Sequence, residues 1–188
     1  MTAKFVKFIG IAALMASAAG CGEFTRQGRA PVVVVVDRLS AEEGQGTLLS
    51  DVVTKSSTFN DMARVEMSLV SKDPGASAGA GPSALNAVTI ARYRVEYRRT
   101  DGRNVQGTDV PYAFDSALTF TITGPQGAAF QIVRHTAKSE APLKALAVNN
   151  DVISTIAYVT FYGRDQAGND VSATASMGID FGNFADRD

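Results

Sequence analysis

Four groups of side chains in this 188-residue chain could do chemistry. The only cysteine, Cys21, offers a thiol at the end of an apolar segment, and the only histidine, His135, offers a base near neutral pH. Oxygen ligands for a calcium ion are grouped at Asp165, Asn169 and Asp170. A run of basic side chains could attract an anion, and its members are Arg92, Arg94 and Arg98.

The lone histidine argues against catalysis. A single His135 excludes metal sites built from several histidines, and no G-x-S-x-G nucleophile motif accompanies it. We therefore interpret His135 as a surface or sheet-edge residue. The sequence predicts no enzymatic activity and no cofactor, and we assign no catalytic residue and no metal site.

The acidic turn has two interpretations that the sequence leaves open. Asp165, Asn169 and Asp170 could hold calcium in a loop, but the spacing of an EF-hand is absent. Aspartate and asparagine are also expected in a hairpin turn, where their side chains bond to the local backbone.

The arginines alternate along a predicted strand. A period of two puts Arg92, Arg94 and Arg98 on one face of residues 88–99, together with Glu96. The simpler interpretation is a solvated strand face. The alternative is a binding face for an anionic glycan, a lipid headgroup or an acidic protein, and the three arginines are its candidate residues.

The first twenty residues have the layout of an export signal. Lys4 and Lys7 precede an apolar run over residues 8–19, and small residues stand directly before Cys21. A membrane-spanning helix needs about 20 apolar residues, so this run is too short for a permanent anchor. We predict that residues 1–20 are a signal peptide that is cleaved.

The end of this signal carries a family resemblance. Residues 18–21, Ala-Ala-Gly-Cys, resemble the lipobox of bacterial lipoproteins, although that family prefers leucine where this chain has Ala18. The resemblance implies cleavage before Cys21, diacylation of its thiol and a lipid anchor in an envelope membrane. Gly22 follows the cysteine where aspartate would favour retention in the inner membrane. By the enterobacterial sorting habit, this implies the outer membrane rather than the inner membrane.

The processed chain is predicted to form one domain. Residues 21–30 are the lipidated cysteine and a short polar tether, and residues 31–188 are long enough for a single core. Removing residues 1–20 takes away Lys4 and Lys7 and no acidic residue, so the formal charge moves from −1 to −3. This balance gives no electrostatic reason to expect a nucleic-acid partner.

Apolar residues recur mostly at every second position after the tether, which predicts strands with one buried and one wet face. The clearest segments are residues 60–70, 88–99, 118–123 and 171–181. Tyr97 and Phe120 are predicted to face the core. The unbroken run Val32–Val36 instead predicts a strand buried on both faces. Only residues 138–147 offer a helical spacing, long enough for a turn or so.

Two of these segments resemble known sandwich domains. Residues 90–98, followed by Asp101-Gly102, look like the third-strand pattern of fibronectin type III domains. Residues 158–181 resemble the last hairpin of bacterial immunoglobulin-like domains. The resemblance implies an all-β fold, a single antiparallel β-sandwich of roughly seven to nine strands and immunoglobulin-like topology, after the cleaved signal peptide. The tryptophan and the cysteine pair of many such domains are absent.

Together these observations predict a non-enzymatic, lipid-anchored protein of the bacterial cell envelope. Its contact with the membrane would run through acylated Cys21, and its sandwich would be a binding module for a protein or glycan partner. The alternative is a structural component of a multi-protein envelope or secretion complex.

Overall fold

The computed structural model describes residues 28–73 and 84–184, and most of this part of the chain is β-structure. Strands make up 57% of these described residues and helices 9%. The strands are β1 (Val32–Ala41), β2 (Thr47–Asp51), β3 (Asp61–Ser71), β4 (Val88–Arg98), β5 (Phe114–Ile122), β6 (Gln126–Val133), β7 (Ile153–Asp165) and β8 (Asp170–Gly182). The helical elements are one turn each, η1 (Ala84–Asn86), α3 (His135–Lys138) and α4 (Leu143–Leu146). The prediction of an all-β fold is therefore confirmed.

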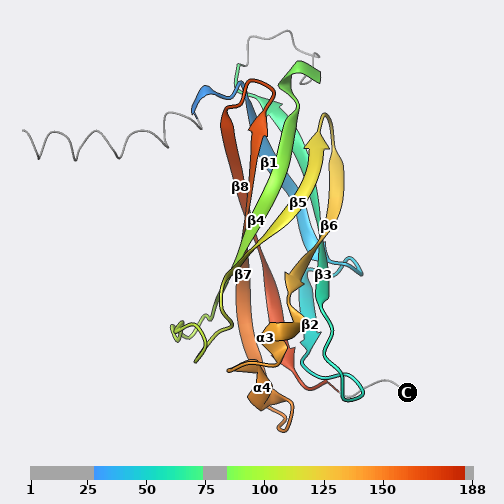
Figure 1. Cartoon of the computed structure of the whole chain (residues 1–188), viewed down its shortest axis with the longest axis vertical. Helices are drawn as coiled ribbons and strands as arrows, with labels where there is room; N and C mark the ends of the chain where they lie inside the picture. Colours follow the sequence, from blue (N-terminus) through green and yellow to red (C-terminus); the bar gives the residue numbers. More distant parts are fainter. Residues whose placement is uncertain (1–27, 74–83, 185–188) are drawn as a thin grey trace, which may run out of the picture.

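The strands form two sheets that lie face to face along the long axis of the molecule (Figure 1). The three-stranded sheet has the order β1-β3-β6, and the five-stranded sheet has the order β2-β8-β7-β4-β5 and is curled. Nearly all pairings are antiparallel, as predicted, but β2 pairs with β8 in parallel. The prediction of a purely antiparallel sandwich is therefore wrong at this edge of the five-stranded sheet. The chain reaches that edge by crossing directly from β1 in one sheet to β2 in the other.

The period-two pattern explains how these strands share a core. On β4, Tyr93, Val95 and Tyr97 are buried, while the side chains between them point to solvent. Both tyrosine hydroxyls cross to the other sheet: Tyr93 Oη donates to the carbonyl of Gln131 (2.7 Å) and Tyr97 Oη donates to that of Ile132 (2.6 Å). Buried phenols need such partners, so these bonds tie β4 to β6.

The valine run on β1 differs from its prediction. Val32 and Val34 are buried, but Val33 is 43% exposed and Val35 is 36% exposed. The strand therefore has one buried and one wet face, because β1 is an edge strand of a sheet that has core on only one side. A run of identical residue types carries no period, so it could not reveal this.

Strand β5 shows a related effect of an edge position. Phe120 and Leu118 pack against the core from one side, as predicted, but both are only partly buried. Because β5 is the last strand of the five-stranded sheet, none of the described strands pairs with its far side. We therefore expect Phe120 to contribute less to stability than the fully enclosed Tyr97.

The predicted helical segment forms two short turns that close one end of the sandwich. α4 follows Pro142, and α3 carries Lys138, whose side chain is only 2% exposed. Lys138 Nζ donates to the Asp61 carboxylate (2.8 Å) and to the carbonyl of Asp51 (2.7 Å), and Ser50 Oγ donates to the same Asp61 carboxylate. This buried pair joins α3 to both sheets, because Ser50 lies on β2 and Asp61 on β3.

The chain enters the sandwich at the opposite end. The start of β1 lies beside the end of β3, where Lys72 N donates to the carbonyl of Pro31, and beside the β7–β8 turn (Figure 1). The predicted signal peptide and Cys21 lie outside the described residues, as does most of the tether over residues 21–30. Within the described part, none of the helices has the length and apolar character needed to cross a membrane.

Candidate functional site in the outer face of the five-stranded sheet

The predicted arginine face exists as a continuous surface. Arg92, Arg94 and Arg98 all project from the outer side of β4, as the alternation required. Their side chains are 57%, 37% and 61% exposed, respectively. The neighbouring strands β7 and β5 add Tyr158, Tyr162 and Asp115 to the same surface.

Acidic side chains alternate with the arginines along this row. Arg94 lies between two carboxylates, at 2.6 Å from Asp115 and 2.9 Å from Glu96. Arg92 is 3.4 Å from Asp115, and Arg98 is 3.6 Å from Glu96. The row therefore has little excess charge of either sign, and exposed pairs of this kind contribute about 0–1 kcal/mol each to stability.

The hydrogen bond between Arg94 and Glu96 has an electrostatic consequence for both groups. The guanidinium of Arg94 holds the pKa of Glu96 below its ordinary value of 4.5. In return, Glu96 and then Asp115 raise the pKa of Arg94. Arg94 and Glu96 are consequently both charged at neutral pH.

Two of the arginines also stack on tyrosines of the neighbouring strand. The guanidinium carbon of Arg92 lies 4.1 Å from the centre of the Tyr162 ring, and that of Arg98 lies 5.0 Å from the centre of Tyr158. Contacts of this kind hold the flat guanidinium in place while leaving its edge available for hydrogen bonds. Arg92 and Arg98 are thus each held by a carboxylate on one side and by a ring on the other.

A β-bulge breaks the regular surface near one end of β4. The pairing of β4 with both neighbours shifts between Ile90 and Arg92, so Ala91 and Arg92 are both exposed. Opposite the bulge lies Gly163 of β7, where a Cβ atom would come within 2.4 Å of the Thr89 carbonyl oxygen. Only glycine fits at this position, and a bulge with such a glycine is a feature that re-aims nearby side chains.

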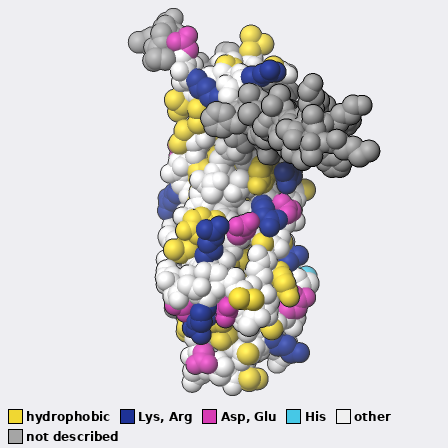
Figure 2. Space-filling view, turned by 90° about the vertical axis from the view of Figure 1, so that its left-hand side faces the viewer, with side chains coloured by type: hydrophobic (Ala, Val, Ile, Leu, Met, Phe, Trp, Pro, Cys, Tyr) yellow, Lys and Arg dark blue, Asp and Glu magenta, His cyan; other side chains and the backbone are white. Residues whose placement is uncertain are grey.

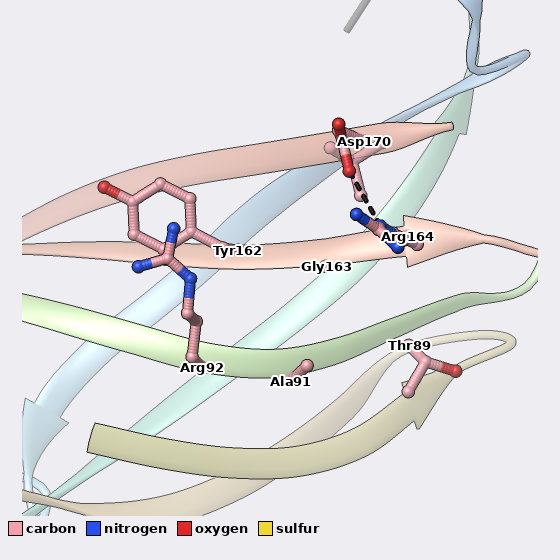
Figure 3. Close-up of a pocket in the computed structure, with 8 residues that line it drawn as sticks. Thr89, Ala91, Arg92, Tyr162, Gly163, Arg164 and Asp170 are labelled. Atoms are coloured by element: carbon pink, nitrogen blue, oxygen red, sulfur yellow. Dashed lines mark hydrogen bonds and ion pairs between the residues drawn. The ribbon is translucent and has the colours of Figure 1, made fainter. Parts of the chain in front are cut away.

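The bulge creates a hollow of about 530 Å³ in the outer face. Its floor is formed by the small residues Thr89, Ala91, Gly163 and Val171. Figure 3 shows Arg92 against the Tyr162 ring on one side of this floor. The other side carries a salt bridge of 2.8 Å between Arg164 Nε and Asp170, whose side chains are 70% and 36% exposed.

Charged side chains of both signs are interspersed with hydrophobic ones on the side of the molecule seen in Figure 2. Basic and acidic groups lie next to one another there, and no large field of a single sign is visible. On the arginine face itself each arginine lies within ion-pair distance of a carboxylate, so a partner must be recognised by local geometry more than by long-range attraction.

The structure accounts for the acidic turn through contacts within the protein. The Asp165 carboxylate accepts bonds from the backbone N–H groups of Ala167 (3.0 Å) and Asn169 (2.8 Å) and from the Asn169 side chain (2.7 Å). Desolvation by itself would raise the pKa of Asp165, but these donors outweigh it and lower the pKa. Asp170 points to Arg164, and the described residues contain no group of three or more His, Cys, Asp or Glu side chains arranged for a metal ion.

His135 lies at the other end of the molecule, at the start of α3. Its Nδ1 is 2.9 Å from the side-chain oxygen of Asn60, which also accepts the His135 backbone N–H. The ring is exposed, so its surroundings match the predicted surface position.

Sequence reasoning found Arg92 and, as a candidate calcium ligand, Asp170, but not the other residues around the hollow. Tyr162, Gly163 and Arg164 belong to β7, some seventy positions further along the chain. A glycine inside a strand pattern is a known signal of a bulge or close backbone contact, so Gly163 was the available clue. The register that brings it to Ala91 depends on the bulge and could not be read from the alternation.

Comparisons with known proteins do not assign this chain to a family. No family model matches it, and no curated protein matches it. A structural-genomics target named SoR45 aligns over 81% of this chain and 86% of its own, with 11% identity and a TM-score of 0.36. A putative late embryogenesis abundant (LEA) protein aligns over 93% and 83%, with 9% identity and a TM-score of 0.42. The Bacillus subtilis sporulation control protein Spo0M aligns over 79% of this chain and 49% of its own, with 11% identity and a TM-score of 0.29.

Proposed function

We propose that this protein is a non-enzymatic, lipid-anchored component of the bacterial envelope that binds a partner on the outer face of its five-stranded sheet. The anchor is the acylated thiol of Cys21, and the outer membrane is the favoured location. The partner is a protein or a glycan. The single observation that carries the binding role is the hollow at Ala91 and Gly163, edged by the Arg92–Tyr162 stack.

The strand order supports an immunoglobulin-like topology as part of this proposal. Such sandwiches place their third, sixth and seventh strands side by side, and their first, second and fifth strands in the facing sheet. When the short β2 and the edge strand β5 are left out, β4 corresponds to the third strand of such a sandwich. The orders β8-β7-β4 and β1-β3-β6 then follow that arrangement, and β5 is an added neighbour of the third strand. The parallel β2 and the curl of the larger sheet are departures from it.

The arrangement along the long axis supports an oriented binding module. The tether is short, because nine extended residues between Cys21 and Pro31 reach about 30 Å. The end of the sandwich that contains the start of β1 and the β7–β8 turn would therefore face the membrane, and α3 and α4 would point away (Figure 1). The outer sheet face would run along the side, where a partner can reach it.

A specific observation favours the alternative, a structural component of an envelope or secretion complex. The outer side of the three-stranded sheet exposes Val33, Val35 and Val70, and Val33 pairs directly with Val70 across β1 and β3. β1 is also an edge strand of its sheet, and a strand of another protein could extend such an edge. An apolar edge of this kind fits a stable protein contact better than a glycan.

The anchor is tested by Cys21→Ser. Acylation requires the thiol, so we expect the variant to lose palmitate labelling and to leave the membrane fraction or keep its signal peptide. Gel mobility, metabolic labelling and membrane fractionation of the wild-type and variant chains measure this. A variant that still labels and still partitions with membranes would show that the anchor is not at Cys21.

The binding face is tested by charge reversal. Arg92→Glu with Arg94→Glu should slow association with purified envelope membranes that lack the protein, and added salt should weaken the wild-type interaction over a Debye length of about 8 Å. Arg64→Glu is the matched control, since Arg64 is an exposed arginine paired with Glu66 on the other sheet. Equal loss in both variants would point to nonspecific charge, and unchanged association in both would refute the binding face.

A further inference from the structure

We propose that the hollow at the β4 bulge binds one acidic sugar residue, such as a uronic acid. This inference rests on the proposed function, because it names the ligand class for the same sheet face. The sugar ring would lie on the floor made by Ala91 and Gly163, between the Tyr162 ring and the Arg164–Asp170 pair.

The shape of the hollow suits a compact, flat ligand. The floor carries only the small residues Thr89, Ala91, Gly163 and Val171, and Gly163 cannot be replaced because a Cβ atom would overlap the Thr89 carbonyl. The hollow is shallow and open, with a volume of about 530 Å³, so it would cover one ring and leave its neighbours in solvent. One unit of a longer glycan can occupy such a site.

The charges around the hollow select an acidic group. Arg92 and Arg164 lie on opposite sides of it, and both are more than half exposed. Arg164 gives its Nε to Asp170, so its terminal amino groups can donate a bidentate pair to a carboxylate. Arg92 is held by Tyr162 and Asp115, so its guanidinium is already oriented before a ligand arrives.

The remaining groups favour a sugar over a phosphate. Asp170 can only accept hydrogen bonds when ionised, and it would repel a doubly charged phosphate. A uronic acid offers hydroxyl donors to Asp170 and to Thr89 as well as a carboxylate for the arginines. Its apolar C–H face can pack on Ala91 and the Tyr162 ring while its polar groups meet the few polar side chains of the hollow.

Two sources of this chemistry are distinguished by the choice of probe. Trigalacturonate represents a free acidic glycan, and vesicles that contain a glucuronosyl diacylglycerol represent an acidic sugar on a lipid headgroup. Binding of the full-length protein in mild detergent is measured by calorimetry for the trisaccharide, with neutral galactotriose as the control. The same protein, with the same variants, is measured against the vesicles by flotation.

We expect the trisaccharide or the vesicles to bind and galactotriose not to bind. Ala91→Phe fills the hollow from an exposed position and should weaken binding at least tenfold. Arg164→Ala should do the same. Ser176→Phe is the matched control, since Ser176 is exposed on the outer side of β8, pairs with Tyr158 rather than with a residue of the hollow, and should retain full binding.

The outcomes separate this inference from the proposed function. Failure of both acidic probes, or equal binding of galactotriose, overturns the acidic-sugar assignment. If Ala91→Phe then still abolishes association with envelope membranes, the sheet face remains the binding surface for another partner. Acidic-sugar binding that survives Ala91→Phe and Arg164→Ala overturns the site.

Discussion

The two sheets share one core but present different surfaces to water. The outer side of the three-stranded sheet exposes valines, with Val33 opposite Val70 and Val35 next along β1. The outer side of the five-stranded sheet instead carries arginines held by carboxylates and tyrosines, with Arg92 and Arg94 at its centre. The alternation that builds the core leaves outward positions free, so each sheet can acquire a different contact chemistry.

This difference separates the two functional hypotheses by surface. The polar face, with its hollow, suits a ligand recognised by hydrogen bonds and a ring contact. The valine face, with the open edge of β1, suits a protein that extends the sheet. Variants that act on one face without disturbing the shared core can therefore test the two hypotheses independently.

The largest expected effect comes from the core that joins both faces. Tyr97→Ala should lower the free energy of unfolding by about 3–5 kcal/mol, because it removes a buried ring and its bond to Ile132. Tyr97→Phe keeps the ring, and the smaller loss of about 1–3 kcal/mol reports the unsatisfied carbonyl alone. Urea unfolding of both variants measures this. If the two variants lost the same free energy of unfolding, the Tyr97 ring would contribute nothing to the packing of the two sheets.

The buried ion pair near α3 comes next. Lys138→Ala leaves the Asp61 carboxylate without its cation, and we expect a loss of about 3 kcal/mol. Lys144→Ala on the neighbouring α4 is the control, since Lys144 is exposed and should change stability by no more than about 0.5 kcal/mol. A tolerated Lys138→Ala would mean that water reaches Asp61.

Single substitutions on the outer faces should have the smallest effect on stability. Arg94→Ala removes two exposed ion pairs and should cost no more than about 1 kcal/mol. Val35→Lys on the other face should be equally mild, because Val35 is already partly in water. The same unfolding assay applies. If Arg94→Ala lowered the free energy of unfolding as much as Tyr97→Ala, the inward and outward faces of β4 would have been assigned the wrong way round.

The pH dependence sharpens the contrast between exposed and buried carboxyls. Hydrogen bonding to Arg94 lowers the pKa of Glu96 below 4.5, so its contribution to stability is present above that pH and is lost as the pH falls. Desolvation raises the pKa of Asp61 above 3.8 despite Lys138, so its contribution is greatest below that pH and is lost as the pH rises through the raised value. Carboxyl NMR titration should show these opposite shifts, and shifts of the same sign would contradict the burial difference.

Much of the fold could be predicted because one-sided burial leaves a period of two in the sequence. The inward residues of β4 and the outward arginines were both identified in this way. The prediction that β1 is buried on both faces was wrong, because a run of identical residue types does not show which face is exposed to water. The parallel pairing of β2 was not predicted, since a short edge strand has too few residues to carry a pattern.

The candidate site was predictable only in part for a related reason. Arg92, Arg94 and Arg98 follow from the strand pattern, whereas the hollow lies at a bulge where Gly163 pairs with Ile90 and Ala91 is left unpaired. The Lys138–Asp61 pair joins segments far apart in the chain, and nothing local marks a lysine that will be buried. Long-range register and tertiary burial are set by packing, which single-strand periodicity does not encode.

The central claim is that the outer face of the five-stranded sheet is the binding surface. Site-specific photo-crosslinking tests it directly, with a benzophenone side chain placed at exposed Thr174 on β8 or at exposed Arg64 on β3 of the membrane-bound, full-length protein. Both positions are exposed strand residues, so their stability costs should match. We predict an envelope adduct from position 174 and none from position 64. An adduct from position 64 alone would contradict the claim and favour the valine-bearing sheet.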